Sequence, residues 1–337
     1  MSMLSVAQVD HSPAPTAAGL RATARRLIVL ASGDATALLD LIPQIQEQRF
    51  EVVRVVRVDD LRPDVELIEL SVAALLRDQI WGIVVSSSDH CKLPCEALLQ
   101  CRINGIRVLS ETSFWEQEAR FIDTATQNPS WFLSAEGFRS SQVEQLRQRA
   151  FDLIIATALL ALTLPLMLMV ALLIKLDSRG PIMYRQDRTG LGGRSFSMLK
   201  FRSMRTDAET SGSPRWCQQA DPRITRVGRL IRLTRIDELP QLLNVLRGNM
   251  SVIGPRPERP YFVDRLAAVI PHYNARHFVK PGITGWAQVK APYGASIEDA
   301  QTKLRYDLYY VKHRGLRLDL LILLKTFKVI LLQKGAR

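Results

Sequence analysis

Short apolar runs alternate with amphipathic stretches along the first third of the chain. Aliphatic runs of the kind found in β-strands occupy residues 27–30, 52–58, 80–86 and 106–109. Between them, apolar residues recur at helical spacing over residues 35–48, 65–77 and 95–103. Strands that alternate with helices are typical of a parallel sheet built from βαβ units. The pattern predicts an α/β domain over residues 25–140, preceded by a flexible polar tail over residues 1–24.

The turn after the first predicted strand bears on what this domain binds. A dinucleotide-binding domain carries a G-x-G-x-x-G turn at this point. Here the turn reads ASGDA over residues 31–35, with a single glycine at Gly33. We therefore expect a domain with a regulatory or subunit-contact role, and dinucleotide binding is the less favoured alternative.

A long apolar run follows in the middle of the chain. Residues 153–174 read LIIATALLALTLPLMLMVALLI, 22 residues without a charge. As a straight helix the run reaches ~33 Å, enough to cross a bilayer core of ~30 Å. Pro165 would kink such a helix, and the basic residues at both ends favour placing both on the cytoplasmic side. From these residues alone, a helix that re-enters the membrane within residues 145–180 and a plain spanning helix remain equal alternatives.

The rest of the chain, residues 181–337, lacks another run of this kind. Residues 318–332 are apolar, but Lys325 and Lys328 interrupt them. Such a pattern predicts an amphipathic helix that lies on a membrane or on a protein core.

The charge of the chain indicates an anionic partner. The formal net charge is +12, and residues 185–256 alone hold 14 Lys or Arg against 6 Asp or Glu. Nucleic acid, a phospholipid surface and a phosphorylated substrate would each fit this balance. Aromatic residues make up only 7% of the chain, which argues against recognition of single strands by base stacking.

Asp237 and Glu238 are adjacent carboxylates in this basic region. An isolated pair of this kind is most often a solvated helix start or a partner in ion pairs. The apolar positions between residues 239 and 246 predict a helix, which would place the pair near a positive helix N-terminus. Two carboxylates among arginines suit phosphoryl chemistry, because one can attack phosphorus or hold Mg²⁺ while guanidinium groups neutralise the phosphate.

From about residue 149 to the end, the chain resembles the bacterial sugar transferase family, the monotopic phosphoglycosyl transferases. Four consecutive blocks carry the resemblance: RAFDLIIATALLALTLPLMLMVALLIKLDSRGPIMYRQDRTG, SFSMLKFRSMRTDAE, DPRITRVGRLIRLTRIDELPQLLNVLRGNMSVIGPRPERP and VKPGITGWAQVK. The preceding βα region is similar to the Rossmann-like domain of long-form members, in particular those of exopolysaccharide and PEP-CTERM loci. The resemblance implies a re-entrant membrane helix followed by a mostly helical catalytic domain.

The resemblance also implies an activity and its residues. Such enzymes transfer a sugar-1-phosphate from a UDP-sugar to undecaprenyl phosphate at the cytoplasmic face of the bacterial inner membrane, the initiating step of exopolysaccharide or glycoconjugate synthesis. By analogy, Asp237 attacks the sugar-proximal phosphate, UMP leaves, and a covalent phosphosugar forms, while Glu238 helps to hold Mg²⁺. The phosphate-binding set is Lys200, Arg202, Arg235 and Arg256. Pro165 corresponds to the break of the re-entrant helix, although the family's usual Ser-Pro is here Leu164-Pro165.

Two rival functions remain at this point. A catalytically idle membrane scaffold for polysaccharide assembly would use residues 25–140 as a docking module. A membrane-tethered binder of nucleic acid or anionic lipid would tolerate Asp237→Asn and bind with steep salt dependence. We expect no nucleic-acid partner, and a homo-dimer through either domain is compatible with the sequence.

Overall fold

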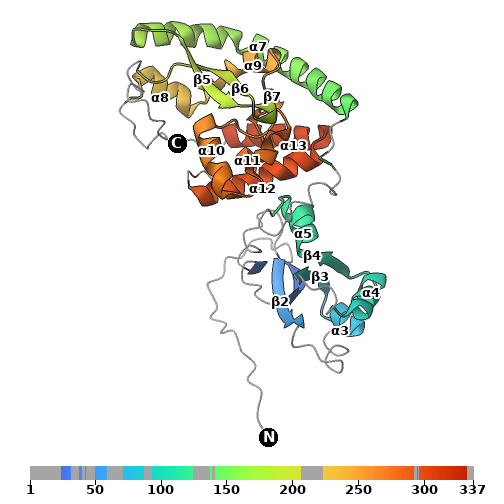
Figure 1. Ribbon diagram of the computed structural model, residues 1–337. Coiled ribbons are helices and arrows are strands. Elements are labelled where there is room, and N and C mark those ends of the chain that lie inside the picture. Colours follow the sequence, from blue (N-terminus) through green and yellow to red (C-terminus); the bar gives the residue numbers. More distant parts are fainter. Residues whose placement is uncertain are drawn as a thin grey trace, which may run out of the picture. The chain divides into compact units, whose positions relative to one another are not determined.

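The computed structural model describes residues 24–31, 50–58, 71–86, 93–123, 141–205, 223–291 and 296–331, with short pieces at 38–39, 42, 137–138 and 294. The chain divides into two compact units, Met1–Ala119 (unit 1) and Arg120–Arg337 (unit 2). Figure 1 shows the elements of each unit.

Unit 1 is built on a sheet of four parallel strands. They are β1 (Arg25–Ala31), β2 (Phe50–Arg57), β3 (Ile80–Ser86) and β4 (Arg107–Ser110), in the order β2-β1-β3-β4. The predicted parallel sheet is confirmed. The Rossmann-like order is not confirmed, because β3 adds beside β1, as in flavodoxin-type sheets, whereas the dinucleotide-binding order adds the third strand beside the second.

Helices cover the sheet of unit 1. They are α3 (Val72–Arg77), α4 (Cys95–Ile103), α5 (Glu111–Phe114) and the π-helical turn η4 (Trp115–Ala119). The bounds predicted for α4 are confirmed, α3 is the last part of its predicted helix, and the predicted helix over residues 35–48 falls mostly outside the described residues.

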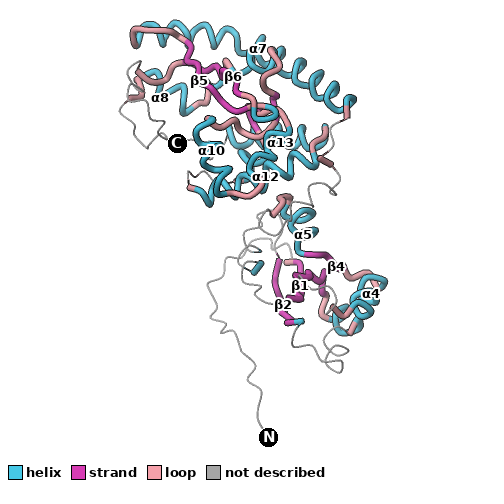
Figure 2. The backbone as a smooth tube through the Cα atoms, viewed as in Figure 1, coloured by secondary structure: helices cyan, strands magenta, loops and turns pink. Residues whose placement is uncertain are grey.

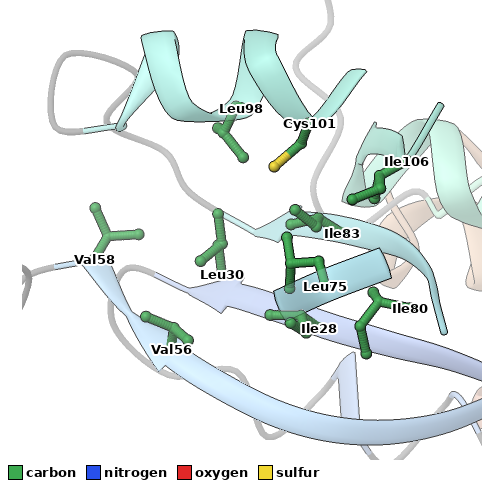
Figure 3. Packing of buried hydrophobic residues seen from close by; sticks show 10 residues of the cluster. All are labelled: Ile28, Leu30, Val56, Val58, Leu75, Ile80, Ile83, Leu98, Cys101 and Ile106. Carbon is green, nitrogen blue, oxygen red and sulfur yellow. The ribbon is translucent and has the colours of Figure 1, made fainter. Parts of the chain in front are cut away.

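Figure 3 shows the core between this sheet and α4. Leu98 and Cys101 of α4 face Leu30 and Ile83 of the sheet, and all four belong to one buried cluster. The two inner strands, β1 and β3, are aliphatic and largely buried, as is typical of the central strands of a parallel sheet, whereas the edge strand β2 is mostly exposed.

Unit 2 begins before its long helix. Trp286 is buried, and its indole Nε1 donates to the carbonyl oxygen of Arg120 at 2.9 Å. Ile122 lies in the core of unit 2, and Asp123 pairs with Arg305 at 2.9 Å. The segment that directly follows residue 119 is therefore part of the packing of this unit.

The long helix α7 (Gln142–Asp177) has 36 residues and starts at a capping box formed by Ser141 and Glu144. In Figure 1 it arches along the rest of unit 2. Its buried residues form one narrow strip at helical spacing: Asp152, Ala156, Met167, Val170 and Ile174. Most of its remaining apolar side chains are exposed, and within the described residues it is the one helix long and apolar enough to cross a membrane.

α7 continues through Pro165 without ending. Proline has no N–H, so the carbonyl of Ala161, four residues earlier, loses its usual helical donor. The hydroxyl of Thr163 donates at 2.7 Å to the carbonyl of Leu159 instead. Thr163 therefore does not replace the missing donor.

The remainder of unit 2 is mostly helical with short strands, as Figure 2 shows. The strands are β5 (Met183–Thr189), β6 (Ser195–Phe201), β7 (Ser251–Ile253) and β8 (Gly282–Thr284). The helices are α8 (Arg226–Leu233), α9 (Gln241–Leu246), α10 (Pro260–Val269), α11 (Trp286–Lys290), α12 (Ile297–His313) and α13 (Leu316–Leu331), with 3-10 turns η5 (Leu191–Gly193), η6 (Ile236–Glu238) and η7 (Tyr273–Phe278).

The predicted amphipathic C-terminal helix is confirmed as α13. Ile322 is fully buried, and Asp319 accepts a hydrogen bond from Tyr310 at 3.0 Å inside the core. Large apolar side chains three or four residues apart remain exposed on α13: Leu316, Leu320, Leu324 and Phe327.

Candidate active site

A hairpin and a sharp turn bring the predicted site residues together. β5 and β6 pair antiparallel, and Lys200 lies near the end of β6, directly opposite Tyr184. After α8, Arg235 adopts a left-handed conformation with φ of 57°. This reversal leads into η6, which holds Asp237 and Glu238 directly before α9. The carboxylate pair thus precedes a helix, as predicted.

Glu238 is held by two cations. Lys200 Nζ lies 2.9 Å and Arg256 Nη2 2.7 Å from its Oε1, while Arg256 Nη1 is 3.5 Å from its Oε2. Arg256 also donates to Gln288 Oε1 at 3.2 Å. Burial alone would raise the pKa of Glu238, but Arg256 and Lys200 outweigh it and hold that pKa well below its usual range. Glu238 is therefore a fixed anion at neutral pH.

Asp237 has a different environment from its neighbour. Its side chain is buried, yet no side chain among the described residues donates a hydrogen bond to its carboxylate. Burial raises the pKa of Asp237, and the positive charge of Lys200 opposes this rise. The carboxylate is held between cations while its oxygens stay available to another group.

A buried arginine supports the loop that carries Arg256. Arg276 donates to the carbonyl of Arg256 at 2.9 Å and to the hydroxyl of Tyr273 at 2.7 Å. Its Nη2 also lies 2.8 Å from Asp307 Oδ2 of α12. The direction of Arg256 is therefore set from the core of unit 2.

Arg188 holds the same loop from β5. Its Nη1 donates to the carbonyl of Pro257 at 3.0 Å, and it pairs with Glu258 at 3.6 Å. Burial lowers the pKa of Arg188 to about 10, which still leaves it charged at neutral pH. Neither Arg188 nor Arg276 was singled out from the sequence, because nothing in their spacing links them to residues 237 and 256.

The other two predicted phosphate-binding residues, Arg202 and Arg235, have different surroundings from Lys200 and Arg256. Arg202 is buried, and its Nη2 donates to the carbonyl of Ser178 at 2.7 Å and to its hydroxyl at 2.8 Å, which caps the end of α7. Arg235 is exposed and forms the reversal before η6. The structure therefore brings together Lys200 and Arg256 with the carboxylates, and places Arg202 at the end of α7.

The carboxylates offer a limited site for Mg²⁺. The described residues contain no group of three His, Cys, Asp or Glu side chains that would form a cage by themselves. Mg²⁺ is commonly bound by one or two carboxylates together with substrate phosphates. Oε1 of Glu238 is occupied by both cations, whereas Oε2 has only the 3.5 Å contact with Arg256. Oε2 and the Asp237 carboxylate therefore fit an ion that a diphosphate would share.

Known proteins resemble this chain over its second half and beyond. A model of the family described as bacterial sugar transferase matches residues 143–333. An undecaprenyl-phosphate glucose phosphotransferase of Komagataeibacter xylinus is 34% identical over 335 residues, covering 97% of this chain and 62% of the relative.

Two further relatives differ in the sugar that their names give. A UDP-N-acetylgalactosamine-undecaprenyl-phosphate N-acetylgalactosaminephosphotransferase of Aeromonas hydrophila is 50% identical over 190 residues, or 56% of this chain and 45% of the relative. A UDP-glucose:undecaprenyl-phosphate glucose-1-phosphate transferase of Caulobacter vibrioides is 45% identical over 193 residues, or 57% and 72%. The chain thus spans 45% and 62% of the first two relatives it matches.

Proposed function

The chain belongs to the bacterial sugar transferase family, and from this premise we propose that it transfers a sugar-1-phosphate from a UDP-sugar to undecaprenyl phosphate. The relatives named for undecaprenyl-phosphate sugar transfer support the reaction class. The reaction releases UMP and begins the assembly of an exopolysaccharide or glycoconjugate.

The observation that carries the proposal is the contrast between two adjacent carboxylates. Glu238 is neutralised by Lys200 and Arg256, whereas Asp237 receives no side-chain hydrogen bond from the described residues. A buried carboxylate beside fixed cations is a nucleophile that needs no separate base, since it is already ionised above its pKa. A purely structural pair would be expected to have both members satisfied.

The proposed chemistry has two displacements at phosphorus. An Asp237 carboxylate oxygen forms a bond to the sugar-bearing phosphorus of the donor, and the bond from that phosphorus to the bridging oxygen breaks, so that UMP leaves. A phosphate oxygen of undecaprenyl phosphate then attacks the same phosphorus and displaces the Asp237 carboxylate. The products are UMP and an undecaprenyl diphosphate sugar, and the enzyme is regenerated.

The cations at the site would make the first displacement feasible. Lys200 and Arg256 reduce the repulsion between an anionic nucleophile and a diphosphate. We propose that Asp237 and Oε2 of Glu238 hold Mg²⁺ with the donor, where the ion would neutralise charge on the leaving UMP. The buried Arg276 and the half-buried Arg188 keep the loop of Arg256 in one position.

The packing of α7 supports a membrane helix that stays with its domain. Its buried strip runs from Asp152 to Ile174, so the apolar part contacts unit 2 along its length. A helix that crossed ~30 Å of hydrocarbon would carry these contacts into the bilayer. We therefore propose that α7 enters and leaves by the cytoplasmic leaflet, with its exposed apolar side chains in lipid.

The test is UMP release from a panel of UDP-sugars by the full chain in nanodiscs, with undecaprenyl phosphate and Mg²⁺. The panel is needed because relatives named for glucose and for N-acetylgalactosamine both match. We expect release that requires lipid and metal, and that Asp237→Asn abolishes. Asp264→Asn, on the exposed side of α10, is the matched control.

Mass spectrometry of the reaction without lipid should find a phosphosugar on the peptide that contains Asp237. A folded, membrane-bound wild type that is silent on every donor would contradict the proposal and favour the scaffold. Turnover that persists in Asp237→Asn would contradict the assigned nucleophile.

A further inference from the structure

A cavity of about 290 Å³ lies in unit 2 beside the β5–β6 hairpin, which carries Lys200. Its described lining comes from β5, with Tyr184, Gln186 and Asp187, and from the start of α10, with Arg259 and Tyr261. None of this lining belongs to β6, the strand that pairs with β5. The cavity therefore lies along the other edge of β5, where a strand presents unpaired backbone N–H and C=O groups.

This cavity is connected to the carboxylates through the hairpin. Tyr184 is directly opposite Lys200 in the antiparallel register, and side chains so placed share one face with Cβ atoms about 5 Å apart. Lys200 in turn contacts Glu238 at 2.9 Å. The cavity thus begins one side chain away from the proposed reaction centre.

A second line of contacts joins the cavity to the loop of Arg256. Gln186 Nε2 donates to the hydroxyl of Tyr184 at 3.2 Å, and Arg188 Nε donates to Gln186 Oε1 at 3.0 Å. Arg188 then reaches the carbonyl of Pro257. Hydrogen bonds therefore connect the cavity to the backbone of the loop that carries Arg256.

The lining has the chemistry of a nucleoside site. Two phenol rings offer faces on which a base can stack, and the Gln186 amide and the open strand edge can read the polar rim of a base. Asp187 can accept hydrogen bonds from ribose hydroxyls, and Arg259 can meet a phosphate. The charged and amide groups make the cavity unsuitable for an isoprenoid chain.

The size and the rigidity of the cavity fit the same ligand. Its volume is at the low end of the roughly 300–1,000 Å³ of ligand sites, which suits a nucleoside rather than a whole sugar nucleotide. The ring of Tyr261 is exposed but held, because Arg265 Nη1 donates to its hydroxyl at 3.1 Å.

We propose that this cavity binds the nucleoside of the donor, with the Tyr261 ring stacked on the base. The proposal rests on the proposed function and adds to it the place where the leaving nucleotide is held. Donor binding would then extend from this cavity, past Arg259, to the carboxylates at residues 237 and 238.

The test compares Tyr261→Ala, Tyr261→Phe and Val269→Ala in the full chain in nanodiscs. Val269 is exposed at the far end of the same helix and serves as the matched control. The dissociation constants of UMP and of glucose-1-phosphate are measured by calorimetry, and KM and kcat with the preferred UDP-sugar. Tyr261→Ala should weaken UMP binding and raise KM on the order of tenfold, with kcat little changed. Tyr261→Phe, which keeps the ring, should restore both values.

The outcomes separate this proposal from the proposed function. If Tyr261→Ala turns over the donor and binds UMP as tightly as Val269→Ala does, the proposal that the cavity binds the nucleoside is wrong. The proposed transferase function is not affected by that result. A loss confined to glucose-1-phosphate would assign the cavity to the sugar and also overturn the proposal. A wild type that binds UMP through Tyr261 but turns over no donor would support the cavity and contradict the function.

Discussion

Replacing Glu238 with a neutral residue tests whether its negative charge stabilises the protein by pairing with Lys200 and Arg256. Glu238→Gln keeps the shape of the side chain but leaves Lys200 and Arg256 without their shared anion. Breaking a buried ion pair costs ~3–5 kcal/mol. Glu238 and Lys200 are 12% and 18% exposed, but Arg256 is 39% exposed and its share is screened by water. We therefore expect a loss of about 2–3 kcal/mol in the free energy of unfolding.

Asp237→Asn is the matched comparison one residue away. The raised pKa of Asp237 means that burial disfavours its charge, so the neutral side chain should cost no stability. For a unit of this size a loss of 2–3 kcal/mol corresponds to a fall in Tm of about 4–12 °C. Thermal unfolding of both variants at neutral pH by circular dichroism measures the difference.

The pH dependence gives an independent check of the same reasoning. A depressed pKa contributes stability above the unfolded value of ~4.3, and that stability is lost as pH falls through the folded pKa. The gap between wild type and Glu238→Gln should therefore close in acid. A Glu238→Gln variant that melts with wild type at neutral pH, or an Asp237→Asn variant that is the less stable of the two, would refute the reasoning.

Three further predictions concern residues of unit 2 outside the carboxylate pair and the boundary of that unit. Burial lowers the pKa of His277 to about 4, so stability should fall as pH drops from about 6.5 to 4, by up to about 3 kcal/mol, and His277→Gln should flatten this part of the profile of unfolding free energy against pH. Gly228→Ala should lower Tm clearly, because its Cβ would lie 2.0 Å from a backbone carbonyl oxygen. Gly315→Ala should not, because the nearest atom to its Cβ would lie at 4.0 Å, an ordinary contact distance; equal Tm values would contradict this. Deleting residues 1–119 should leave unit 2 folded in a protease-resistance assay, while deleting 1–140 should destabilise it by removing buried contacts, and equal resistance of the two truncations would argue against that boundary.

The sequence predicted the strands of unit 1 well for a physical reason. The inner strands β1 and β3 are largely buried and therefore need aliphatic runs, which are visible in the sequence, and β2 is marked by its many valines. The order of the strands was not accessible in this way, because aliphatic runs carry no information about which strand pairs with which. The Rossmann-like expectation came from the resemblance, and the placement of β3 beside β1 does not confirm it.

In the candidate site, too, part of the arrangement was predicted from the sequence and part was not. Asp237, Glu238, Lys200 and Arg256 were all expected from the resemblance, and the structure brings them together. Arg202 was grouped with Lys200 because the two are close in the sequence. β6 ends at Phe201, however, and the next residue leaves the strand to cap α7. The direction that the chain and its next side chain take after a strand ends depends on tertiary packing. A cluster of basic residues in the sequence does not specify that direction.

The narrow buried strip of α7 has a consequence for the synthesis of this protein. The helix leaves the ribosome long before some of the elements that cover it, since Ala156 packs against β7 and the buried Ile322 of α13, which come much later in the chain. At about 5–20 residues per second, the interval between Asp177 and Ile322 is roughly 7–29 s. During that time the part of the helix around Ala156 lacks the β7 and α13 side chains against which it packs in the folded protein. Because the helix is synthesised first, we expect it to be delivered to lipid, or bound by a chaperone, before the rest of unit 2 has been made.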